Sequence, residues 1–111
     1  MARTVEWTEA AADDLDEAAS FINRDSPYYA AAFVREVKQA AKSLQFFSER
    51  GRVVPEGHRE DVREIFIKSY RLIYLVTQAR VFILAFVHGA RDLQSLWKKH
   101  RELNAISESD T

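Results

Sequence analysis

The fold of this chain is decided by residues 62–91, which read VREIFIKSYRLIYLVTQARVFILAFVHGAR. This stretch contains three runs rich in β-branched and aromatic residues, at 62–67, 70–76 and 81–87. Only short polar connections separate the runs, and such spacing is typical of hairpins. The sequence therefore predicts an antiparallel meander, with the unbroken apolar run 81–87 as its interior strand.

Two arginines lie inside these strand-like runs, Arg63 in the first and Arg71 in the second. A guanidinium is costly to hold against apolar surface unless another group pairs with it. Arginines within a sheet therefore suggest a face kept open and cationic for an anionic partner. The alternative for Arg71 is a structural ion pair with Glu64 or another carboxylate.

The turn between the first two runs fixes how these arginines are arranged. If Lys68-Ser69 is a two-residue turn, Phe66 lies opposite Arg71 and Arg63 lies opposite Tyr74. The two arginines then occupy opposite faces of the sheet. A joint site would need a different register or a bulge, so Arg71 is the stronger candidate.

The N-terminal half predicts a short edge strand over 4–7 and then two helices. Thr8 is a candidate N-cap for a helix that extends to about Asn23, and Ser26-Pro27 is a start signal for a second helix. Each helix carries one apolar stripe at spacings of three and four residues, so the pair forms a hairpin that needs the sheet as its partner. Three phenylalanines are expected to extend the buried surface of these helices: Phe21, Phe46 and Phe47.

Length and composition limit the remaining possibilities. A chain of 111 residues with no cysteine is expected to form one domain in a reducing compartment, here the cytoplasm. No apolar run is long enough to span a membrane, and the dispersed histidines predict no metal site and no cofactor. We expect the domain to cover residues 1–106, including a last helix capped by Asp92, and residues 107–111 to be a disordered tail.

Charge is divided unevenly along the chain. Residues 1–49 carry five Lys or Arg against nine Asp or Glu, whereas residues 50–104 carry eleven against six. A basic half of this kind suggests a surface for an acidic chain or a nucleic acid. The alternative is a solvated helix face at Lys98, Lys99 and Arg101.

An ordered set of short motifs resembles the RelE/ParE family of toxins from bacterial type II toxin–antitoxin systems. The motifs are Val5-Glu6-Trp7-Thr8, Asp14-Leu15, Ser26-Pro27, Gly51-Arg52, Arg63-Glu64, Tyr70-Arg71-Leu72-Ile73-Tyr74 and His88-Gly89-Ala90-Arg91-Asp92. The resemblance implies an α+β fold: a short N-terminal strand, a two-helix hairpin packed on a mainly antiparallel sheet, and a short C-terminal helix. It also implies a cognate antitoxin that wraps the toxin through a segment that folds on binding.

The family resemblance further implies roles for individual residues. In nuclease members of the family, the arginine matching Arg71 contacts the scissile phosphate, and Arg63 matches the preceding Arg-Glu strand. His88 and Glu56 match positions where some members keep a catalytic histidine and a glutamate base, and Arg91 belongs to the His-Gly-Ala-Arg motif. These residues are the candidate functional set.

Two targets are known in the family, DNA gyrase for ParE-like members and translated mRNA on the ribosome for RelE-like nucleases. The chain lacks a tyrosine after His88 that could stack on a base, and its net charge of −1 is unlike that of strongly basic nucleases. These departures favour gyrase and leave open whether the protein is an enzyme. The alternatives are a ribosome-dependent endoribonuclease, or an attenuated toxin that serves as a small α+β binding module.

Overall fold

A computed structural model describes residues 2–57 and 59–89 of the chain. The elements follow the order β1 (Thr4–Trp7), α1 (Glu9–Asn23), α2 (Pro27–Ser43), β2 (Arg52–Val53), β3 (Val62–Ile67), β4 (Tyr70–Val76) and β5 (Arg80–His88). Among these residues, no helix is both long and apolar enough to cross a bilayer.

The strands form one sheet with the order β1-β5-β4-β3-β2. β3, β4 and β5 are antiparallel neighbours, and β1 pairs in parallel with β5, so the predicted meander and the interior position of β5 are confirmed. Lys68 takes a positive φ of 54° in the two-residue turn. This turn gives the expected register, with Phe66 opposite Arg71 and Arg63 opposite Tyr74.

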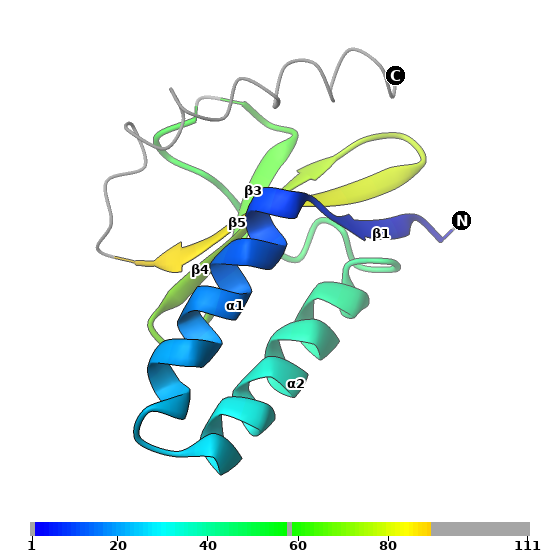
Figure 1. Cartoon of the computed structure of the whole chain (residues 1–111). Helices are drawn as coiled ribbons and strands as arrows, with labels where there is room; N and C mark the ends of the chain where they lie inside the picture. The colour runs from blue at the N-terminus through cyan, green and yellow to red at the C-terminus, as the bar shows by residue number, and fades with distance from the viewer. Residues whose placement is uncertain (1, 58, 90–111) are drawn as a thin grey trace.

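The two helices start at the residues that the sequence predicts. The Thr8 hydroxyl accepts from the Ala11 amide at 3.1 Å and also donates to the Ile83 carbonyl of β5 at 2.8 Å, so the same side chain caps α1 and ties it to the sheet. Ser26 caps α2 and Pro27 occupies its first turn. The helices lie side by side (Figure 1) and pack on one face of the sheet.

Within residues 2–57 and 59–89, one face of the sheet is covered by α1 and α2 and the other has neither of these helices. We call them the helix-covered face and the helix-free face. The helix-covered face holds the larger apolar core, which includes Phe33, Val37, Leu72, Tyr74 and Phe86. The helix-free face holds a second, smaller apolar cluster formed by Val54, Val62, Ile73, Leu75, Phe82, Ala85 and Val87. Strand alternation sends neighbouring residues to these two different surroundings.

One irregularity interrupts the pairing of β4 with β5. Ile73 lies opposite Ala85 whereas Tyr74 lies opposite Ile83, so Leu84 is the extra residue of a bulge. The Asp14 carboxylate of α1 accepts from the Phe86 amide at 3.1 Å next to this point. The bulge thus lies in β5 and leaves the register of the two strand arginines unchanged.

Three aromatic predictions for the helical half are wrong. Phe21, Phe46 and Phe47 are exposed, with Phe46 at 69%. Phe21 lies beside the buried stripe of α1, and α2 ends at Ser43, before the helical period could carry the other two residues inward. The predicted last helix from Asp92 and the tail at 107–111 lie outside the described residues.

Candidate functional site

Arg71 is the centre of an ion-paired group on the helix-free face. Its side chain is only 6% exposed. The Arg71 Nε donates to Glu64 Oε1 at 2.6 Å, and the two terminal nitrogens each donate to one oxygen of Glu56 at 3.1 Å. All three nitrogens of this guanidinium therefore donate to one of two carboxylates.

Glu64 joins a second arginine to this group. Its side chain is fully buried, and its Oε2 accepts from Arg52 Nε at 2.6 Å. The pairing of β2 with β3 places Arg52 directly opposite Glu64, and β4 places Arg71 beside them. We call Arg52, Glu56, Glu64 and Arg71 the ionic cluster. It holds two cations and two anions, so its formal charge is zero.

The ionic cluster perturbs the titration of two of its members. The hydrogen bond from Arg71 lowers the pKa of Glu56, against the smaller opposing effect of burial. Burial lowers the pKa of Arg71, but hydrogen bonds and charge from Glu56 and Glu64 outweigh burial and leave that pKa raised. Both groups are held in their charged forms. Arg71 thus follows the structural ion-pair alternative, and the expectation of an open cationic face is not met at this residue.

Arg63 lies on the opposite face, as the register predicts. Its terminal nitrogen donates to the Gly51 carbonyl at 2.9 Å. The Gly51 amide in turn donates to the Tyr74 hydroxyl at 3.0 Å, and that hydroxyl donates to the Ser48 carbonyl at 2.8 Å. A Cβ at Gly51 would collide with the Tyr74 hydroxyl and lie 2.5 Å from the Glu64 carbonyl oxygen. Arg63 and Gly51 therefore belong to a packed junction between β3 and the segment before β2.

His88 also lies on the helix-covered side, at the exposed end of β5. It is opposite Tyr70, with ring centroids 5.7 Å apart, whereas Arg71 is opposite Val87 on the other face. Tyr74, the partner of Arg63, lies four residues along β4 from Tyr70. At ~3.3 Å per residue, His88 and Arg63 are separated by ~13 Å along the strand direction.

The structure therefore divides the candidate residues into three places. Arg71 and Glu56 are in contact on the helix-free face, and Arg63 and His88 lie at different ends of the helix-covered face. Arg91 lies outside the described residues. The roles assigned to these residues remain predictions.

The sequence reasoning missed one exposed pair on the helix-free face. The Arg52 guanidinium carbon lies 5.2 Å from the centre of the Phe66 ring, within cation–π distance. Arg52 has 59% of its side chain exposed and Phe66 is 54% exposed. The signal available in the sequence was strand alternation, which puts Phe66 on the same face as Glu64 and Arg71 and opposite the apolar core.

This architecture defines a class: a small α+β protein with a helical hairpin on one face of a five-stranded sheet. A sequence model of a protein family, described as the ParE toxin of the type II toxin–antitoxin system parDE, matches residues 5–93 of this chain. The chain belongs to this family. Toxin RelE2 of Caulobacter vibrioides is 35% identical over 91 residues, which are 82% of this chain and 99% of the relative.

Two solved structures share the fold. The chromosomal ParDE toxin–antitoxin system from P. aeruginosa matches with a TM-score of 0.65 and 22% identity, over 78% of this chain and 95% of that one. The toxin–antitoxin complex RelBE2 from Mycobacterium tuberculosis matches with a TM-score of 0.55 and 26% identity, over 79% and 99%. The predicted RelE/ParE resemblance and the α+β fold class are confirmed.

Proposed function

We propose that this toxin arrests growth by binding DNA gyrase, without cleaving RNA, and that a cognate antitoxin neutralises it. The observation that carries the proposal is the separation of Arg71, Arg63 and His88 described above. RNA cleavage needs a base, a cation and an acid around one phosphate. Here Arg71 and Glu56 share the helix-free face, but Arg63 and His88 lie at different ends of the opposite face.

The state of Arg71 gives a second argument against phosphate binding. An RNA phosphate would have to displace Glu56 or Glu64 from the guanidinium, because these carboxylates occupy the nitrogens that would form a bidentate contact. Glu64 is fully buried and would be left with Arg52 alone. Losing a buried partner is strongly unfavourable, so the ionic cluster resists this exchange.

The exposed Arg52–Phe66 pair supports contact with a protein target. Arginine and aromatic side chains dominate the energetics of protein interfaces. Glu64 holds Arg52 in place through the 2.6 Å ion pair, so Arg52 loses less conformational freedom on binding. Arg52 is itself a member of the charge-neutral ionic cluster, and a neutral cluster suits a mixed protein surface better than a phosphate backbone.

An antitoxin is the second partner that we propose. Both similar solved structures carry titles that name toxin–antitoxin systems, ParDE and RelBE2. We extend this association to the present chain, for which the antitoxin would be the product of a gene beside the toxin gene.

Inhibition of purified gyrase tests the proposed target. The toxin should block supercoiling of relaxed plasmid, and Phe66→Ala should raise the concentration needed by roughly 10-fold or more, the effect of losing an interface hot spot. Phe46→Ala is the matched control, because Phe46 is also a largely exposed phenylalanine and follows the end of α2. Normal supercoiling with wild-type toxin, together with cuts in translated mRNA, would overturn the proposal in favour of a ribosome-dependent nuclease.

A further inference from the structure

The two helices carry opposite charge. α1 contains five acidic residues and no Lys or Arg, whereas α2 contains three cationic residues and one acid. The buried residues of both helices are apolar and pack against the sheet, so the charges lie on the remaining sides of the helices. We call the side of the helical hairpin that is turned away from the sheet the outer face. It has an acidic half and a basic half.

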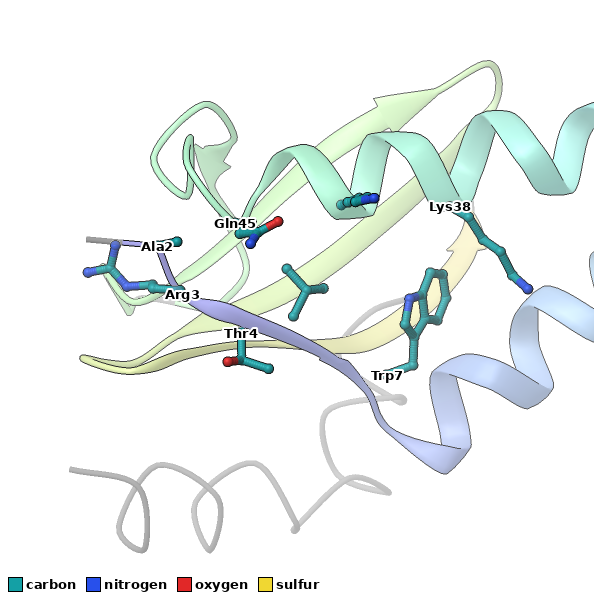
Figure 2. A pocket seen from close by; sticks show the side chains of 8 residues that line it. Ala2, Arg3, Thr4, Trp7, Lys38 and Gln45 are labelled. Atoms are coloured by element: carbon teal, nitrogen blue, oxygen red, sulfur yellow. The ribbon is translucent and has the colours of Figure 1, made fainter.

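The exposed charges on each helix form a row. Three acids of α1 and three cations of α2 recur at steps of three and four residues, so each set shares one side of its helix. We call these sets the acidic row (Glu9, Asp13 and Asp16) and the basic row (Arg35, Lys38 and Lys42). Lys38 lies at the margin of the basic row, and Figure 2 shows its chain extending from α2 beside the Trp7 ring.

The spacing of one row mirrors that of the other. α1 and α2 lie side by side (Figure 1), and as consecutive helices of a hairpin they run in opposite directions. Counted from the hairpin end, both rows have a step of three residues followed by a step of four. Each row therefore spans seven residues, or ~10 Å, and its charges lie at the same heights as those of the other row.

The charges of both rows are left without partners of their own. Within residues 2–57 and 59–89, no member of either row forms an ion pair. The ion pair of α2 in this part of the chain joins Glu36, outside the basic row, to Lys68. Both rows are therefore available to a second molecule.

Symmetry decides which molecule fits this pattern. In a two-fold dimer whose axis runs parallel to the helices, α1 of each copy lies against α2 of the other, antiparallel and at equal heights. The mirrored spacing then sets an acid opposite a cation along both contacts. An axis across the helices would instead set α1 against α1, acid opposite acid. The outer face is thus complementary to a second copy of itself in the first arrangement, and repels it in the second.

The hairpin end of the outer face adds an aromatic side chain. Tyr28 lies seven residues before Arg35 and therefore on the same side of α2, and it is 75% exposed. An axis parallel to the helices keeps the hairpin ends of both copies together, so Tyr28 meets the last turn of α1 of the second copy. A tyrosine supplies a large contact area in such a place.

We propose that the chain forms a two-fold symmetric homodimer through the outer face of its helical hairpin, with the acidic row of each copy against the basic row of the other. Because this dimer uses the helical side, the helix-free face of each copy points away from its centre. The exposed Arg52–Phe66 pair stays accessible in both copies. The inference does not depend on gyrase as the target.

Sedimentation equilibrium of the purified full-length toxin tests the dimer. At low salt the toxin should sediment with twice the mass of one chain, and added salt should weaken the association because it screens the facing charges. The D13K/D16K variant should raise the dimer Kd by roughly 10-fold or more, because symmetry repeats each change at both contacts. E49K/E60K is the matched control, since it makes the same change in net charge at exposed residues outside the helices.

A mixing experiment identifies the face and the orientation. The R35E/K42E variant should also dimerise weakly by itself, because both of its helices are then acidic. An equimolar mixture of D13K/D16K and R35E/K42E should form a heterodimer, in which opposite charges again face each other at both contacts. Recovery in the mixture also shows that both variants are folded, and circular dichroism checks each one separately.

Three results would overturn the inference. The first is wild-type toxin that is monomeric at low salt, and the second is an equal loss of association in E49K/E60K and D13K/D16K. The third is a mixture that stays monomeric although both variants are folded, because association would then use another face. If monomeric toxin still blocks supercoiling, the homodimer fails and the proposed function stands.

Discussion

The two faces of the sheet use the same strands for different purposes. On the helix-covered face, α1 and α2 bury an apolar core that includes Phe33, Leu72 and Phe86. On the helix-free face, an apolar cluster adjoins the ionic cluster of two arginines and two glutamates. The helix-covered face is stabilised by apolar area removed from water, whereas the helix-free face combines buried apolar area with charges that each need a partner.

This difference shows how a strand can hold charged side chains without exposing a net charge to solvent. Glu64 and Arg71 occupy inward positions on neighbouring strands, where an isolated charge would be prohibitive. Each is neutralised within the cluster, and only Arg52 and part of Glu56 reach solvent. The ionic cluster on the helix-free face is thus neutral where the sequence suggested a cationic surface.

The largest effect is expected at the ionic cluster. Glu64→Ala should lower the free energy of unfolding by ~3–5 kcal/mol, because it leaves the buried Arg71 with Glu56 alone and releases Arg52. Chemical denaturation measures the change, and the exposed Glu60→Ala is the control. A loss as small as that of the control would show that the cluster does not depend on paired charges.

A double replacement also tests whether the ionic cluster depends on paired charges. Glu64→Leu combined with Arg71→Met replaces both buried charges by apolar groups, and such replacements are often neutral or stabilising. The double variant should therefore unfold at a higher denaturant concentration than Glu64→Ala. If it is less stable than the single variant, the cluster contributes through interactions other than the mutual neutralisation described above.

The helix-covered face should respond to lost volume. Leu72→Ala is expected to cost ~2–5 kcal/mol, because Leu72 is fully buried in the larger core. Its effect should be the same at low and high salt, whereas a charge-dependent effect on the helix-free face should change with ionic strength. Denaturation at two salt concentrations makes the comparison, and a strong salt dependence for Leu72→Ala would contradict it.

The Tyr74 hydroxyl gives an intermediate effect. Tyr74→Phe should cost ~1–3 kcal/mol, because it leaves the Ser48 carbonyl and the Gly51 amide without their partner in a buried place. Burial also raises the pKa of this phenol, so Tyr74 stays neutral up to high pH. Thermal unfolding measures the loss, and a variant as stable as wild type would mean that water replaces the hydroxyl.

The smallest effect is expected at Glu56 and depends on pH. Arg71 lowers the pKa of Glu56 in the folded state, so the carboxylate stabilises the fold above its unfolded pKa of ~4.3 and loses this effect as pH falls toward the lowered value. Because the Glu56 side chain is 34% exposed and screened, Glu56→Gln should cost less than ~1 kcal/mol at pH 7. The difference between wild type and variant should shrink in acid, and a difference that grows in acid would contradict the sign.

Much of the fold was predictable because local signals agreed with each other. Thr8 and Ser26 mark both helix starts, and the turn at Lys68 sets the register that separates Arg63 from Arg71. The exposed Phe46 and Phe47 were not predictable from periodicity, because the stop of α2 at Ser43 has no glycine or proline to mark it.

The candidate site was harder to predict, because its character depends on contacts between distant segments. Glu56 lies 15 residues from Arg71 in sequence, and nothing local shows that its carboxylate reaches that guanidinium. The pairing also changes how Arg71 should be tested. Arg71→Ala would leave Glu64 buried with one fewer partner, so a loss of toxicity could come from instability. Phe66→Ala avoids this problem, since Phe66 is largely exposed.

Gyrase is the target that we propose for this toxin, in place of RNA. The most direct measurement is induced expression in bacteria without the antitoxin, with plasmid supercoiling and primer extension on translated messages read from the same culture. If gyrase is the target, we expect growth arrest with altered supercoiling or DNA breaks and intact messages. New in-frame cuts in translated mRNA with unchanged supercoiling would contradict it.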